Sequence, residues 1–248
     1  MAKQRLDYSA TILIVMLVWF PWVAEAQYEY RNVELLSHMP LNELPGIGDG
    51  TDIWGWTDPL TGGEYALVGG ESGTAFVDIT NPNNPQFRGT LPSTTGSSTW
   101  RDIKVNNNHA YIVSDNNGPH GVQIFDLTRL RDVNSPHTFT SDFVYDEVRS
   151  AHNIAINEQS GFAYVTDGRI LDLADPLNPV EVGFVAGGTH DSHAVIYQDA
   201  DTDYQGREIL FSFNGGGVQI FDVEDKSDTF SVSTVNDESF SKNLARHF

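Results

Sequence analysis

The chain has 248 residues, which is enough for one large domain with its own core. Its 14 lysines and arginines stand against 34 aspartates and glutamates, and the formal charge of −20 argues against binding to nucleic acid phosphates or anionic lipid. Because no cysteine is present, disulfide bonds and thiolate metal sites are excluded.

The first segment has the layout of a secretory signal peptide. A basic start precedes an apolar run over residues 11–20, and small residues at positions 24 and 26 offer a cleavage site before Gln27. We predict a signal peptide over residues 1–26, with an uncleaved membrane anchor as the alternative. No second apolar stretch follows, so we expect no membrane span in the mature chain. The location is then secreted, extracellular or at the cell surface, or else periplasmic.

The next feature is a short phrase of apolar residues around an aspartate that recurs four times. Its aspartates are 46 to 50 residues apart, and a period near 45 residues built from strands is typical of propeller blades. We expect each aspartate to accept hydrogen bonds from the turn that follows it. These aspartates are Asp78, Asp126, Asp172 and Asp222.

These repeats predict an all-β fold, a β-propeller of about four four-stranded blades. The repeat region covers residues 27–225, with units at about 52–92, 101–145, 152–186 and 192–225.

Four stretches, YALVG, FVDITNPNNP, AHNIAINEQSGFAYVTDG and DTDYQGREILF, resemble secreted bacterial proteins with LVIVD-type repeats. The most similar group is the choice-of-anchor B family. The resemblance implies a β-propeller exported to the bacterial cell surface. Members carry differing C-terminal anchors, and no biochemical activity is firmly attached to the group.

The two ends of the repeat region do not match each other. Residues 31–40 look like an outer strand without its blade, while residues 229–235 can supply the outer strand of the fourth unit. The polar tail at residues 226–248 departs from the repeat pattern. We therefore expect an incomplete, truncated ring, with a closed four-bladed ring as the alternative.

An acidic loop follows the first strand of the fourth unit. Calcium binds six to eight hard oxygen ligands, and alternating carboxylates in a tight loop can supply several of them. A solvated acidic hairpin loop is the other interpretation. The possible calcium ligands are Asp199, Asp201, Asp203 and Glu208.

A second group of polar residues stands at the starts of the first strands. In a propeller these positions ring the mouth of the central channel. They either cap strand ends by hydrogen bonding, form a ligand-binding surface, or use their histidines to bind a transition metal. The group consists of Asp52, Arg101, Asp102, His152, Asn153, His190 and His193.

Three tryptophans, Trp54, Trp56 and Trp100, lie near the same rim. They are either buried between blades or exposed to contact sugars or peptides. The leading functional hypothesis is an exported binding or interaction module without defined catalysis, whose partner is an extracellular protein or glycan. The alternative is a metal-dependent extracellular enzyme that uses the histidines.

Overall fold

A computed structural model describes residues 33–236 of the chain. Two compact units, Met1–Leu35 and Leu36–Phe248, divide the sequence, and every strand lies in the second. Between residues 33 and 236 the only regular elements besides strands are two short 3-10 turns, η1 (Leu41–Glu43) and η2 (Leu127–Leu130). The predicted all-β class is confirmed.

The strands form four sheets, here named blades 1 to 4, whose main strands pair antiparallel in sequence order. Blade 1 holds β1 (Gly50–Thr57), β2 (Glu64–Gly70), β3 (Gly73–Asp78) and β4 (Gln86–Pro92). Blade 2 holds β5 (Arg101–Asn106), β6 (His109–Ser114), β7 (Val122–Asp126) and β9 (Phe143–Tyr145). Blade 3 holds β10 (Ile154–Asn157), β11 (Phe162–Val165), β12 (Arg169–Asp172) and β13 (Val180–Phe184). Blade 4 holds β14 (Asp191–Ile196), β15 (Glu208–Asn214), β16 (Gly217–Asp222) and β17 (Phe230–Asn236).

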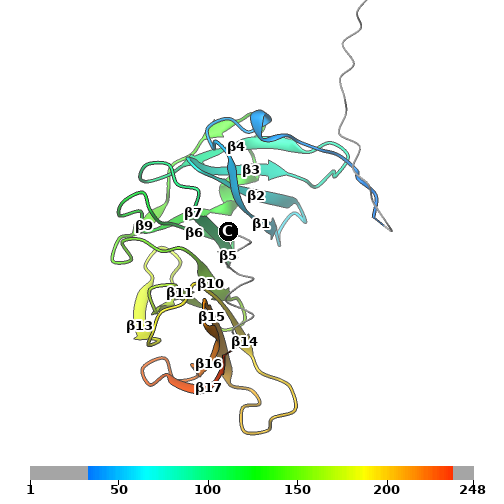
Figure 1. Ribbon diagram of the computed structural model, residues 1–248. Coiled ribbons are helices and arrows are strands. Elements are labelled where there is room, and N and C mark those ends of the chain that lie inside the picture. Colours follow the sequence, from blue (N-terminus) through cyan, green and yellow to red (C-terminus); the bar gives the residue numbers. More distant parts are fainter. Residues whose placement is uncertain (1–32, 237–248) are drawn as a thin grey trace, which may run out of the picture. The chain divides into compact units, whose positions relative to one another are not determined.

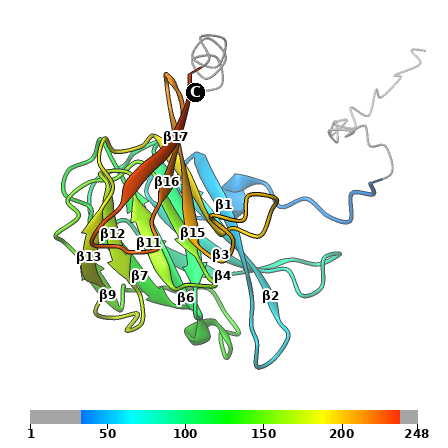
Figure 2. The same ribbon diagram turned by 90° about the horizontal axis from the view of Figure 1, so that it is seen from below.

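The first strands of successive blades are neighbours: β1 contacts β5, β5 contacts β10, and β10 contacts β14. Figure 1 shows that the four blades follow one another in an open arc, with the first strands on its inner side. Strands β1 and β14 lie at the two ends of this arc, so the described blades do not close a ring. Figure 2 shows β17 at the edge of blade 4, where most of its residues are exposed.

The hydrophobic core lies between the blades. Phe76 of blade 1 stacks on Phe125 of blade 2 with 4.7 Å between ring centroids, and Phe139 packs edge-on against both rings. Two further clusters join blade 2 to blade 3 and blade 3 to blade 4. Face-to-face packing of successive sheets is the arrangement that the repeat predicts.

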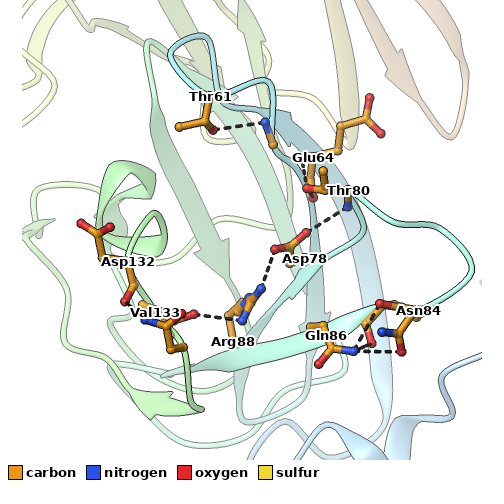
Figure 3. A network of polar contacts seen from close by, with 12 residues as sticks. Thr61, Glu64, Asp78, Thr80, Asn84, Gln86, Arg88, Asp132 and Val133 are labelled. Atoms are coloured by element: carbon orange, nitrogen blue, oxygen red, sulfur yellow. Dashed lines mark hydrogen bonds and ion pairs between the residues drawn. The ribbon is translucent and has the colours of Figure 1, made fainter.

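All four repeated aspartates close the turn after the third strand of their blade. Each carboxylate accepts a hydrogen bond from the backbone N–H two residues later, over 2.8 to 3.1 Å. The predicted structural role is confirmed. At Asp78 the second oxygen also accepts from Arg88 at 2.7 Å, and Arg88 reaches the carbonyl of Val133 at 3.0 Å (Figure 3). This contact links blade 1 to the connection between β7 and β9 of blade 2.

One short strand pairs with a blade other than that of its own repeat. β8 (His137–Thr138) follows β7 in sequence but pairs in parallel with β4, so blade 1 gains a fifth strand. Gly89 permits this approach, because an added Cβ at its φ of +144° would lie 2.1 Å from the carbonyl oxygen of His137.

The start of the repeat region differs from the expectation. Residues 33–40 form no strand, so the predicted outer strand at 31–40 is wrong in its described part. Instead, Leu44 and Ile47 pack on the outer face of blade 1. The predicted outer strand of the fourth unit is confirmed as β17.

The predicted signal peptide lies outside the described residues. Within residues 33–236, no helix has the length and apolar character needed to cross a membrane.

Candidate functional site at the rim of the first strands

Residues at the starts of three first strands meet in one pocket of about 180 Å³. Because β1, β5 and β10 lie side by side, equivalent positions of the repeat come together at this rim. The pocket brings together five of the seven predicted rim residues. Its lining is Thr51, Asp52, Thr99, Trp100, Arg101, Asp102, His152 and Asn153.

The carboxylates of the rim also join the blades to one another. Asp52 accepts a hydrogen bond from the backbone N–H of Ile103 at 2.9 Å, and Asp102 accepts one from Ile154 at 2.8 Å. These two contacts are equivalent, one repeat apart, and each ties a first strand to the next. The same side chains therefore serve both the interface and the wall of the pocket.

In the third blade an amide replaces the carboxylate. Asn153 uses its Nδ2 to donate to the carbonyl of His190 at 2.9 Å. His190 is not part of the lining of the pocket, and the exposed His193 lies on β14, also outside that lining.

A lysine neutralises the most buried rim carboxylate. The ammonium of Lys104 forms an ion pair with Asp102 and lies 4.5 Å from the ring centroid of Trp54. Burial raises the pKa of Asp102 to about 6, against the opposing effects of Lys104 and of the Ile154 N–H. The lysine therefore holds a charge pair and a cation–π contact at the same point.

A buried arginine lies on the other wall. The Arg101 side chain donates to the carbonyl of Gly70 at 2.9 Å and to that of Glu71 at 3.5 Å. Its Nη1 lies 3.0 Å from Nε2 of the fully buried His120, whose Nδ1 lies 2.9 Å from the carbonyl of Gly121. Since arginine only donates, Nε2 of His120 accepts and its proton sits on Nδ1.

Desolvation governs the protonation of this pair. Burial lowers the pKa of His120 to about 4, and the nearby guanidinium adds to this effect. Desolvation also lowers the pKa of Arg101, to about 10, which leaves the arginine charged at neutral pH. His120 was not identified from the sequence, because a lone histidine in a glycine-rich loop carries no recognisable signal.

His152 is held by a second residue that the sequence did not reveal. Its Nδ1 lies 3.1 Å from a carboxylate oxygen of Asp115. The His152 ring also contacts Trp100, with centroids 5.2 Å apart, and His190, with centroids 4.6 Å apart. Asp115 directly follows β6, and its contact with His152 becomes evident only when the position of blade 3 is known.

The tryptophans near the rim have three different environments. Trp56 is buried between blades 1 and 2, as the burial alternative expected. Trp54 is 37% exposed beneath Lys104, and Trp100 is partly exposed and lines the pocket. Of the three tryptophans, only Trp100 therefore lines this pocket.

The acidic loop and Glu208 lie in different environments. Asp199 and Asp201 accept hydrogen bonds from backbone amides of their own loop, at 2.8 and 3.1 Å, and Asp203 is exposed with them. Glu208 is buried and accepts from Asn157 at 2.6 Å, between blades 3 and 4.

Two further contacts hold Glu208 at that interface, from Ser160 at 2.7 Å and from Lys226 at 2.9 Å. No three histidine, aspartate or glutamate side chains among residues 33–236 are grouped as a metal ion requires. Calcium binding at Asp199, Asp201 and Asp203 stays a prediction.

Comparison with known proteins agrees with this architecture. A family model described as LVIVD repeat matches residues 61–91, 98–119 and 148–186. No curated protein matches the sequence.

A solved structure shares the fold: the crystal structure of a functionally unknown protein from Desulfotomaculum acetoxidans DSM 771. It has a TM-score of 0.54 and 15% sequence identity, over 76% of this chain. The match covers 56% of that protein, so this chain spans little more than half of its length. The LVIVD repeat matches thus lie in blades 1 to 3 of an all-β fold with four propeller-type blades.

Proposed function

We propose that this chain is an exported binding module that recognises an extracellular protein or glycan through the rim pocket. The observation that carries the proposal is the meeting of three first strands in one pocket with mixed chemistry. Trp100 contributes an aromatic ring, Thr99 contributes a hydroxyl, and Asp52 and Asn153 contribute a carboxylate and an amide. Concave sites with a few convergent polar groups are the usual places for ligand recognition.

Export is part of the proposal. It is supported by the signal-peptide layout of residues 1–26 and by the resemblance to choice-of-anchor B proteins, which implies attachment to the bacterial surface. Fractionation of the native host tests it directly. Recovery of the chain from the cell surface or medium, with Gln27 as its first residue, is the expected result, and recovery from the cytoplasm would contradict export.

Binding is tested by the indole N–H signals of ¹⁵N-labelled protein during titration with extracellular glycans and peptides. We expect a ligand to shift the Trp100 signal, because its ring lines the pocket. A matched control is Phe230→Ala, an exposed aromatic on blade 4 whose loss leaves the rim intact. If partners bind but leave Trp100 unshifted, the rim pocket is not the binding site.

A metal-dependent extracellular enzyme is the second candidate. It is favoured by the contact between the His152 and His190 rings and by the Asp115 carboxylate on His152, since a carboxylate often orients a metal-binding imidazole. Stoichiometric zinc, copper or iron that is lost in His152→Ala/His190→Ala would support this function. Purified protein without a transition metal, and without gain on adding one, would remove it.

A further inference from the structure

We infer that the ligand of the rim pocket is a neutral sugar residue, which stacks on Trp100 and hydrogen-bonds to the side chains of Thr99 and Asn153. This inference rests on the proposed binding function and narrows it to one chemical class. It follows from the size, the charged groups and the polar groups of the pocket.

The size of the pocket sets the first limit. Its volume of about 180 Å³ lies below the roughly 300–1,000 Å³ of pockets that enclose drug-sized ligands. It therefore suits a single ring with its substituents. A larger ligand could enter the pocket with one group only, such as one sugar unit of a glycan chain.

The charged groups around the pocket already have partners. Lys104 is paired with Asp102, and the guanidinium of Arg101 donates to backbone carbonyls and to His120. Asp52 accepts from the N–H of Ile103, and a carboxylate oxygen of Asp115 lies 3.1 Å from Nδ1 of His152. A charged ligand would have to compete with these contacts, so neither a cation nor an anion gains much from entering.

The remaining polar groups are neutral or have hydrogen-bonding capacity left. Nδ2 of Asn153 is used by the His190 carbonyl, which leaves its side-chain oxygen as an acceptor for a ligand hydroxyl. Thr99 is exposed and its side chain lies in the same lining. Hydroxyl groups of a ligand both donate and accept, so they can pair with the hydroxyl of Thr99 and the side-chain oxygen of Asn153.

The aromatic wall completes the match. Trp100 and His152, both in the lining, have ring centroids 5.2 Å apart at a 46° angle, so the indole supplies an aromatic surface next to the imidazole. A pyranose has one face of C–H bonds and a rim of hydroxyls. It can place the apolar face on the indole while its hydroxyls reach Thr99 and Asn153.

The experiment uses the mature chain and three classes of probe. Neutral methyl glycosides of glucose, mannose, galactose and N-acetylglucosamine are compared with lysine amide as a cation and with glucuronate as an anion. The indole N–H shift of Trp100, assigned with Trp100→Phe, gives the Kd for each probe. We expect at least one neutral glycoside to shift this signal, with weaker or no effect from the charged probes.

The variants test how the ligand is held. Trp100→Ala should raise the Kd of that glycoside about tenfold, measured by calorimetry, which corresponds to about 1.4 kcal/mol. Asp52→Asn should change it less than about threefold, because the ligand is uncharged and the amide oxygen can still accept from Ile103. Phe230→Ala should leave it unchanged. If Trp100→Ala does not fold, Trp100→Phe, with a smaller ring, should raise the Kd by a smaller factor.

The outcomes separate the two proposals. If lysine amide or glucuronate shifts Trp100 while no glycoside does, the sugar inference is overturned and the binding module stands. The same holds if Trp100→Ala leaves the glycoside Kd unchanged. If neither these probes nor any glycan or peptide shifts Trp100, both proposals fail.

Discussion

Blades 1 and 4 each have an outer face that no other described blade covers, and only the outer face of blade 1 is buried. On blade 1, Leu44 and Ile47 cover Ala75 and Val77, and all four residues are almost fully buried. On blade 4 the outer face is the opposite face of the repeat, since Ile220 stands where blade 1 has Phe76, and it carries an apolar hollow of about 190 Å³. Its lining is Tyr197, Asp201, Tyr204, Ile209, Phe211, Ile220 and Val232.

The difference shows that a repeat does not bury both of its own faces. Neighbouring residues of a strand point to opposite faces, so Leu210 of blade 4 packs against blade 3 while Phe211 faces away from it. In the described part of the chain, the cover of blade 1 comes from the segment before β1 and not from a repeat. The packing of an end blade therefore depends on residues that the repeat pattern does not specify.

The largest loss of stability is expected from a substitution in the core between two blades. Phe76→Ala removes a fully buried ring from the core between blades 1 and 2. We expect a loss of about 3–5 kcal/mol in the free energy of unfolding, measured with urea. The exposed-site control Phe230→Ala should change it by less than about 1 kcal/mol. A loss as small as the control's would mean that the blades do not pack face to face.

The outer faces are compared directly by two alanine variants. Ile47→Ala should cost about 2–4 kcal/mol of unfolding free energy, because Ile47 is fully buried on blade 1. Phe211→Ala should cost less than about 1.5 kcal/mol, although more atoms are removed, because that side chain is only partly buried. Equal costs would show that something covers the face of blade 4 in solution.

A pH titration tests the burial of His120, which lies next to Arg101 of the rim. The pKa of His120 falls from its ordinary 6.5 to about 4 on folding, so the unfolded chain binds the proton more readily between these values. The contribution of His120 to stability is therefore complete above pH 6.5 and lost as the pH falls toward 4.

Two measurements follow from this shift. The ring signals of His120 should not titrate between pH 8 and 5, and His120→Gln should flatten the fall in stability between about pH 6.5 and 4. A His120 midpoint near 6.5 in the folded protein would refute the burial of its ring.

Calcium should have the smallest effect, confined to the exposed loop of blade 4. If Asp199, Asp201 and Asp203 bind it, millimolar calcium should raise the Tm by about 2–4 °C, through preferential binding to the folded state. Asp201→Ala/Asp203→Ala should abolish the rise, while Asp142→Ala, which alters an aspartate of blade 2, should keep it. An equal rise in all variants would remove the site.

Much of the fold could be predicted because the repeat encodes it locally. The aspartate phrase fixed the position of each third strand and the turn behind it, as the four side-chain contacts confirm. The meeting of Asp52, Asp102 and Asn153 followed from their equivalent positions in successive blades. Periodicity is sufficient for such features because neighbouring blades repeat the same geometry.

The remaining features depend on contacts that no local pattern encodes. β8 has two residues, too few for a strand pattern, and crosses to blade 1 through the close approach at Gly89. Glu208 was assigned to the acidic loop because of its sequence spacing, but Asn157 and Lys226 hold it between two blades. His120 and Asp115 act on rim residues only through the tertiary structure.

The most direct test of the rim pocket is a nuclear Overhauser spectrum of the mature, folded chain. Trp100 begins blade 2 and His152 begins blade 3, yet their ring centroids lie 5.2 Å apart. We predict strong cross-peaks between their aromatic protons, which are lost in Trp100→Ala. A folded protein without these cross-peaks would contradict the convergence of the first strands, and the pocket would be lost with it.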